Sequence, residues 1–215
     1  MAQYALMGKI DRPGPGEVLN EGEAAVPRLA STVILLRGGA GALELLMVRR
    51  TPKARFMGGV WVFPGGAVDR HEGTDERATR VAGVRELEEE AGIALADPDQ
   101  LVPFSRWITP REVKTRFDTW FFLAHAPDGA EPRIDGEEAV DSGWFTPQAA
   151  LDAYERDEIQ LVFPTIKTLQ QLAPFPSADA LIEHARGREV RPIEPRVVQE
   201  GEVARVVLPG EPGYE

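Results

Sequence analysis

The chain has no cysteine among its 215 residues, which excludes disulfide bonds and thiol catalysis. Histidine is also scarce. His71, His125 and His184 have no metal-like spacing among themselves, and we expect them in structural or exposed positions. No run of 18 apolar residues is present, and residues 1–10 lack a charged-then-apolar signal pattern. We therefore expect a cytoplasmic protein that has no membrane partner.

Basic residues are outnumbered, with 24 Lys and Arg against 35 Asp and Glu and a net charge of −11. A nucleic-acid-binding surface would normally be basic, so the balance argues against a nucleic-acid partner. It does not exclude a phosphate substrate, because a bound metal and local arginines can reverse the field inside a pocket. The length and the 43% hydrophobic content are ordinary for a globular chain with one core.

What the chain does have is a cluster of acids in residues 85–93, RELEEEAGI. On a helix, Glu86, Glu89 and Glu90 fall within one sector of about 100°, whereas Glu88 points roughly the opposite way. Each like-charged pair at this spacing costs about 0.2–0.5 kcal/mol. Gly92 is a typical helix stop, which puts the acids at the negative end of the helix dipole. A divalent cation with oxygen ligands, Mg²⁺ or Mn²⁺, would remove both penalties.

The alternative is a solvated acidic helix face, the usual meaning of such a run. Three neighbouring features favour a binding site instead. Arg85 can orient a carboxylate by charge-assisted hydrogen bonds. Residues 63–66, FPGG, end a strand in a glycine pair whose backbone can approach a ligand closely. Val84, Leu87 and Ala91 form an apolar face that would dock the helix and hold the acids in place.

Residues 85–93 match the second half of the Nudix hydrolase box, R-E-U-x-E-E-x-G-U with U aliphatic, at every specified position. Gly66 and Glu72 supply the first half, G-x5-E. Seven residues usually separate that Glu from the Arg, whereas residues 73–84 make twelve, which leaves the role of Glu72 open. We expect a longer loop before the helix, with Thr74 as its N-cap.

The resemblance extends over residues 30–175. Three residues upstream of the box are similar to the coenzyme A diphosphatase branch of the family: Arg50, Arg55 and Gly59. The His and Gln that many members carry there are replaced by Met57 and Val60. Residues 107–110 and 116–122 resemble the peroxisomal acyl-CoA diphosphatase subgroup, which also lengthens the box.

The resemblance implies an α/β/α sandwich with a mixed β-sheet and metal-dependent hydrolysis of a diphosphate linkage. It implies that Glu89 and Glu90 ligate Mg²⁺ or Mn²⁺, that Glu86 is a ligand or the base, and that the Gly65 carbonyl completes the sphere. Many relatives place a further acidic ligand or base in the loop where this chain has Glu137 and Glu138. Either could reach the site; we take Glu138 as the metal ligand, and a solvated loop is the alternative.

The expected substrate is a small nucleoside-diphosphate compound, first a coenzyme A or acyl-CoA. An ADP-ribose or nucleotide-sugar substrate comes second, and a catalytically silent nucleotide sensor is the rival from another class. Arg50, Arg55 and the Gly66 backbone are the expected substrate contacts; for the arginines, surface positions are an equal alternative. For Met57 and Phe56 we favour core packing over contact with an acyl chain or pantetheine.

Three regions are expected: an N-terminal arm (1–27), the Nudix domain (28–176) and a C-terminal extension (177–215). Hydrophobic patterns predict strands over residues 29–36, 43–50, 60–63, 115–126 and 140–145. They predict helices over residues 75–91, 147–155, 165–172 and 180–186, and extended segments over 196–198 and 203–208. The tail could wrap the core or a second subunit, so a homodimer is left open.

Overall fold

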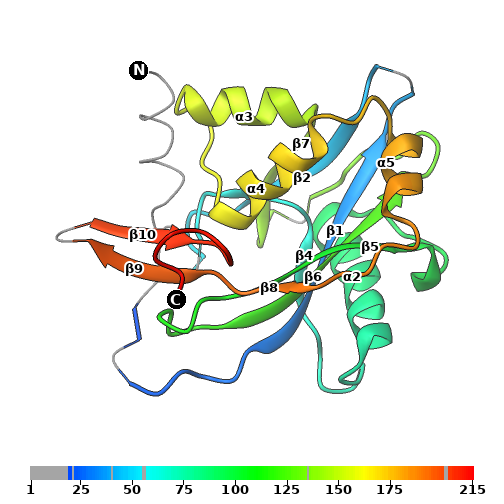
Figure 1. Ribbon diagram of the computed structural model, residues 1–215. Coiled ribbons are helices and arrows are strands. Elements are labelled where there is room, and N and C mark those ends of the chain that lie inside the picture. Colours follow the sequence, from blue (N-terminus) through cyan, green and yellow to red (C-terminus); the bar gives the residue numbers. More distant parts are fainter. Residues whose placement is uncertain (1–18, 21, 40, 55–56, 135, 201–202) are drawn as a thin grey trace.

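The computed structural model describes residues 19–20, 22–39, 41–54, 57–134, 136–200 and 203–215. It shows the expected α/β/α sandwich, in which a mixed sheet lies between helices on both faces (Figure 1). Most of the expected N-terminal arm, together with Arg55 and Phe56, lies outside the described residues.

The main sheet runs in the order β3-β2-β1-β6-β5-β8, while β4 pairs with β1 and β7 pairs with β2. The β1–β6 and β5–β8 pairs are parallel, and the other pairs are antiparallel. The strands are β1 (Arg28–Arg37), β2 (Glu44–Arg50), β3 (Trp61–Val62), β4 (Gly65–Ala67), β5 (Val102–Ile108), β6 (Phe117–His125), β7 (Ala139–Phe145) and β8 (Pro192–Ile193).

The sheet divides between β1 and β2. β1 and β2 form the expected hairpin, but they pair with each other only next to the turn, at Leu36↔Leu45 and Arg37↔Glu44. Further along, β1 pairs with β4 and β6, whereas β2 pairs with β3 and β7. The separation places two groups of strands on either side of the region where the site lies.

Helix α2 (Glu76–Ala91) covers one face of the sheet and carries the acidic cluster. Asp75, and not Thr74, is its N-cap, because the Asp75 carboxylate accepts a hydrogen bond from the Ala78 N–H. Gly92 ends the helix as expected, in the left-handed region at φ 64°. A Cβ on Gly83 would come within 2.6 Å of Ser31 Oγ on β1, so glycine allows the helix to pack closely on the sheet.

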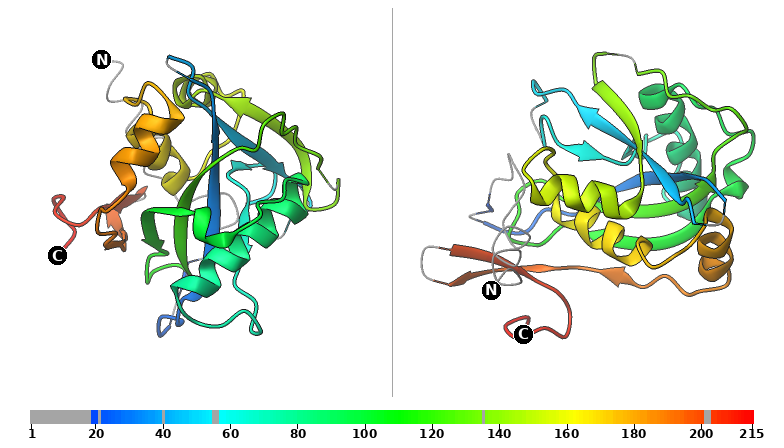
Figure 2. Two further views of the ribbon diagram at one scale, coloured as in Figure 1. Left: turned by 90° about the vertical axis from the view of Figure 1, so that its right-hand side faces the viewer. Right: turned by 90° about the horizontal axis from the view of Figure 1, so that it is seen from above.

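The opposite face is covered by α3 (Pro147–Glu155), α4 (Phe163–Leu172) and α5 (Ala178–Ala185), seen edge-on in Figure 2. Leu169, Leu181 and Ile182 from these helices are buried in one hydrophobic cluster with Ile34 and Phe121 of the sheet. β9 (Arg196–Glu200) and β10 (Val203–Val207) follow as an antiparallel hairpin. The C-terminal residues therefore pack on the same domain, through the β5–β8 pairing and the buried Val206.

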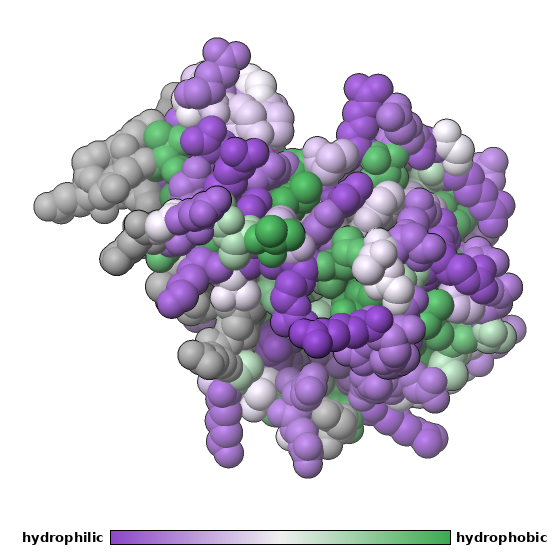
Figure 3. Space-filling model, turned by 90° about the horizontal axis from the view of Figure 1, so that it is seen from below, coloured by the Kyte–Doolittle hydropathy of each residue, from purple (hydrophilic) through white to green (hydrophobic). Residues whose placement is uncertain are grey.

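The predicted helices and strands are all found, but β4, β5 and the two-residue β8 were missed. Pro103 weakens the strand pattern of β5, and it lies at the register shift between Pro103 and Ser105, where a strand tolerates proline. Among the helices in the described ranges, none is both long and apolar enough to cross a membrane. The face viewed from below is mostly hydrophilic, with apolar residues gathered near its centre (Figure 3).

Candidate active site

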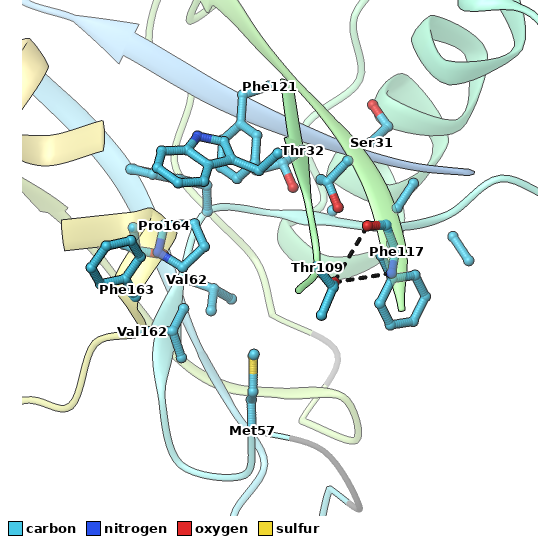
Figure 4. A pocket seen from close by; sticks show the side chains of 18 of the residues that line it. Ser31, Thr32, Met57, Val62, Thr109, Phe117, Phe121, Val162, Phe163 and Pro164 are labelled. Carbon is cyan, nitrogen blue, oxygen red and sulfur yellow. Dashed lines mark hydrogen bonds between the residues drawn. The ribbon is translucent and has the colours of Figure 1, made fainter. Parts of the chain in front are cut away.

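A pocket of about 410 Å³ lies where the two groups of strands separate. Strands β1, β2, β4, β5 and β6 contribute to its walls, together with α2, the start of α4 and the C-terminal segment. Figure 4 shows Val62, Val162 and Phe163 on one side of it and Thr109 and Phe117 on the other. The pocket thus joins segments from nearly the whole length of the chain.

One part of the pocket is strongly acidic. Glu86 and Glu90, one turn apart on α2, line it together with Glu138, which precedes β7. Arg50, at the end of β2, and Gly65, at the start of β4, lie in the same wall. Gly66 lines the pocket as well, so six of the residues expected to bind metal or substrate are brought together.

Glu90 is the most buried of these acids, at 3% exposure. Its Oε2 accepts a hydrogen bond from the Gly65 N–H at 2.9 Å, and its Oε1 lies 3.8 Å from Arg50 Nη1. Burial raises the pKa of Glu90 to about 7, and the nearby Glu86 and Glu138 charges act in the same direction, against the Gly65 N–H and Arg50. An added cation at this point would favour the ionised carboxylate.

Glu86 passes directly over the backbone of Gly66. A Cβ on Gly66 would come within 2.3 Å of Glu86 Oε1 and 2.6 Å of Oε2, so this carboxylate position requires glycine. Burial raises the pKa of Glu86, Arg85 opposes the rise, and Glu89 and Glu138 add to it. Gly66 therefore makes room for the Glu86 carboxylate by its lack of a side chain.

Arg85 links the acids of the box. Its Nη1 donates to Glu86 Oε1 and Glu89 Oε2, both at 2.8 Å, and its Nε donates to Glu72 Oε1 at 3.0 Å. Because Arg85 does not line the pocket, it acts on the site by holding Glu86.

Glu72, whose role the lengthened box left open, binds Arg85. The longer loop expected before the helix is not found: only residues 73–75 precede α2, and residues 76–84 form its first nine residues. The Glu72 side chain, only 3% exposed, still reaches Arg85. Burial by itself raises the pKa of Glu72, but the hydrogen bonds from Arg85 and from the Asp69 N–H outweigh it and lower the pKa overall. The insertion thus leaves the Glu72–Arg85 contact in place.

Other expected site residues lie apart from the pocket. The Glu89 side chain is 59% exposed and bound to Arg85, and it does not line the pocket. Glu88 is exposed, on the side of α2 that the helix geometry predicts. Glu137 is also exposed and does not line the pocket. Arg49 is exposed, and its Nε donates to the Gly59 carbonyl at 3.4 Å.

The carboxylates and the Gly65 carbonyl are oxygen donors, the type that Mg²⁺ and Mn²⁺ prefer. Within the part of the chain that the structure describes, no group of three or more His, Asp or Glu side chains is drawn together as a metal cluster. Instead, the Glu90 carboxylate accepts a hydrogen bond from the Gly65 N–H, and the Glu86 and Glu89 carboxylates accept hydrogen bonds from Arg85. The residues fit a divalent cation by chemistry: Glu86 and Glu90 have little exposed side chain, their charges and that of Glu138 repel one another, and the pKa values of Glu86 and Glu90 are raised.

The remainder of the pocket is apolar, and most of it was not anticipated from sequence. Its apolar lining comes from β5, β6, α4 and the C-terminal segment: Trp107, Ile108, Phe117, Phe121, Val162, Phe163, Pro195, Val197 and Val206. Met57 also lines the pocket and belongs to neither core cluster of described residues, so the expectation of core packing is wrong for it. No local pattern marks these residues, because ordinary core positions have the same composition.

Comparison with known proteins agrees with this geometry. The model of the NUDIX domain matches residues 26–164, more than half of the chain. The chain belongs to the Nudix hydrolase family. A crystal structure of a NUDIX hydrolase from Alicyclobacillus acidocaldarius superposes with a TM-score of 0.67 at 28% identity, covering 74% of this chain and 96% of that one.

Two curated relatives match over part of their length. "Putative nudix hydrolase 7" of Caenorhabditis elegans is 27% identical over 192 residues, which cover 73% of this chain and 64% of that protein. The human acyl-coenzyme A diphosphatase NUDT19 is 30% identical over 116 residues, covering 52% of this chain and 31% of the human protein. The chain therefore spans less than two thirds of the length of each of these relatives.

Proposed function

We propose that this protein is a metal-dependent hydrolase that cleaves the diphosphate linkage of a nucleoside diphosphate joined to another group. The observation that carries the proposal is the convergence of Glu86, Glu90 and Glu138 with Arg50 and Gly65 on one wall of a pocket large enough for a small molecule. Glu86 and Glu90 are largely removed from solvent and repel each other and Glu138, an arrangement that costs stability. A catalytically silent sensor would have no need to keep them.

The residues of the site fall into two groups, those that would bind the metal and those that position them. Glu86, Glu90, Glu138 and the Gly65 carbonyl would hold Mg²⁺ or Mn²⁺, and Glu89 would join them if its exposed side chain turned from Arg85 to the cation. When bound, such a cation neutralises the diphosphate and lowers the pKa of an attacking water. Arg85 is a positioning residue, since it holds Glu86 through a hydrogen bond of 2.8 Å. The Gly65 N–H fixes Glu90 in the same way.

We propose a coenzyme A or acyl-CoA as the substrate. The human relative is named an acyl-coenzyme A diphosphatase, and it matches about half of this chain. Arg50 supplies the cation that a phosphate needs, and its buried Nε has no hydrogen-bond partner among the described residues. A phosphate oxygen would satisfy that donor.

The test is a panel of coenzyme A, acyl-CoA, ADP-ribose and nucleotide-sugar compounds, incubated with Mg²⁺ or Mn²⁺, with products identified by mass. We expect cleavage between the two phosphorus atoms and the highest kcat/KM for the coenzyme A compounds. More efficient ADP-ribose hydrolysis would overturn the substrate assignment. Binding without turnover of any compound would indicate the silent sensor.

Phosphate recognition by Arg50 can be tested with Arg49, its neighbour in the chain, as the matched control. Arg50→Ala removes a charge-assisted contact worth about 1.5–3 kcal/mol, so kcat/KM should fall more than tenfold. Arg49→Ala should change little, because Arg49 is exposed outside the pocket. If coenzyme A loses more activity than 3′-dephospho-CoA in Arg50→Ala, then Arg50 binds the 3′-phosphate. An equal loss would place Arg50 on the diphosphate.

A further inference from the structure

The C-terminal segment forms part of the candidate pocket, although it follows the matched Nudix domain by about thirty residues. Pro195, Val197 and Val206 line the pocket; we call these three residues the C-terminal wall. Val197 and Val206 are directly paired across the β9–β10 hairpin, so both side chains lie on the same face of it. They are joined in the pocket by Trp107 and Phe163, which pack edge to face at 6.1 Å.

The wall is held in place by charged contacts with the loop between β5 and β6. Glu112 accepts hydrogen bonds from Arg196 Nε at 2.9 Å and from the Val197 N–H at 3.2 Å. Arg116, only 7% exposed, donates to Glu194 Oε1 at 2.7 Å. Two ion pairs therefore fix the segment that carries Pro195 and Val197 against the domain.

The groups around this part of the pocket suit a hydrocarbon chain better than a nucleobase. A base needs paired donors and acceptors, but Thr109 Oγ1 is already engaged with the Phe117 backbone, as the dashed lines in Figure 4 show. The indole Nε1 of Trp107 is buried and has no partner among the described residues, and Trp107 is 4% exposed. A chain that carries an amide or thioester carbonyl would supply the missing acceptor.

We propose that the C-terminal wall, with Trp107 and Phe163, forms an apolar subsite for an aliphatic acyl chain on the group joined to the diphosphate. This subsite rests on the proposed function. It adds that the acyl chain of the substrate is selected, and that the C-terminal wall with Trp107 and Phe163 selects it. Each methylene buried there should improve kcat/KM about fourfold until the subsite is filled.

The experiment uses the full chain with Mg²⁺ and measures kcat/KM for acetyl-, hexanoyl- and decanoyl-CoA. We expect decanoyl-CoA to exceed acetyl-CoA more than tenfold. Val197→Asp should abolish this ratio, and Val197→Phe should shift the preference to shorter chains by filling the subsite. The matched control is Val198→Asp, because Val198 is similarly half-buried but is on the opposite face of β9, outside the pocket, and should retain the native ratio.

A flat chain-length profile in the native protein, or a native profile in both Val197 variants, would overturn the subsite. Circular dichroism establishes that each variant is folded. A separate measurement, calorimetric titration of the native protein with decanoyl-pantetheine, distinguishes the two proposals, because this compound has no diphosphate. Binding with a negative heat-capacity change, in the absence of hydrolysis of any CoA compound, would support the subsite and refute the hydrolase proposal. No binding would refute the subsite alone.

Discussion

Gly66→Ala should separate the activity of this protein from its stability. The new Cβ would lie 2.3 Å from Glu86 Oε1 and 2.4 Å from Cδ, distances that real Cβ contacts do not reach. The obstacle is the end of a flexible side chain, so the Glu86 carboxylate swings away while β4 stays in place. Unfolding free energy should fall by only about 1 kcal/mol, the low end for overpacking. Displacing a catalytic group by about 1 Å can cost on the order of 10²-fold in rate, and we expect a loss of that size in kcat.

The neighbouring glycine provides the contrast. A Cβ on Gly65 would lie 2.3 Å from the Ser31 carbonyl oxygen and 2.7 Å from Thr32 Cα. These are backbone atoms of β1, so Gly65→Ala must disturb the β1–β4 pairing and should cost about 3 kcal/mol or more in stability. Gly39→Ala is the neutral control, since nothing lies within 4 Å of the added atom.

Urea melts and kcat with Mg²⁺ would be measured for the three variants and for Gly66→Ala combined with Glu86→Ala. If the clash with Glu86 is the cause, Gly66→Ala should have no further effect on kcat once the Glu86 carboxylate is gone. Additive losses in the double variant, or a native rate in Gly66→Ala, would refute this account.

Three further outcomes are expected. Glu89→Gln should lose on the order of 10²-fold in kcat, whereas Glu88→Gln should stay within a few-fold of native; similar losses in two folded proteins would show that the α2 register argument is wrong. Because the pKa of Glu90 is raised to about 7, the unfolding free energy of metal-free protein should fall by about 3 kcal/mol as pH rises from about 4.5 to 7. Urea melts of Glu90→Gln should lack that slope, and an unchanged slope would contradict the assignment. Arg116→Ala, which leaves Glu194 without its buried partner, should lower stability by about 3 kcal/mol in thermal melts, unlike Arg111→Ala at the exposed end of the same cluster.

Much of the local structure could be predicted because it depends on neighbours in the chain. The α2 acids follow from the helix period, and Gly92 ends the helix through its left-handed backbone. The error at the N-cap, where Asp75 rather than Thr74 accepts the hydrogen bond, arises because both residue types cap well and only the backbone geometry selects between them. β5 escaped detection because proline at a bulge disguises a strand.

The sequence by itself determined the family, the acid cluster and the side of α2 on which Glu88 lies, since a motif and a helical period are properties of adjacent residues. Only the tertiary structure decided that Glu86, Glu90 and Glu138 line one pocket while Glu89, which binds Arg85, does not. Only the tertiary structure showed that Glu72 reaches Arg85 although most of the residues between them belong to α2. It also placed Val197 and Val206 beside Trp107 and Phe163. Contacts between such distant segments depend on how strands pair and helices pack, and no local pattern of residues encodes that arrangement.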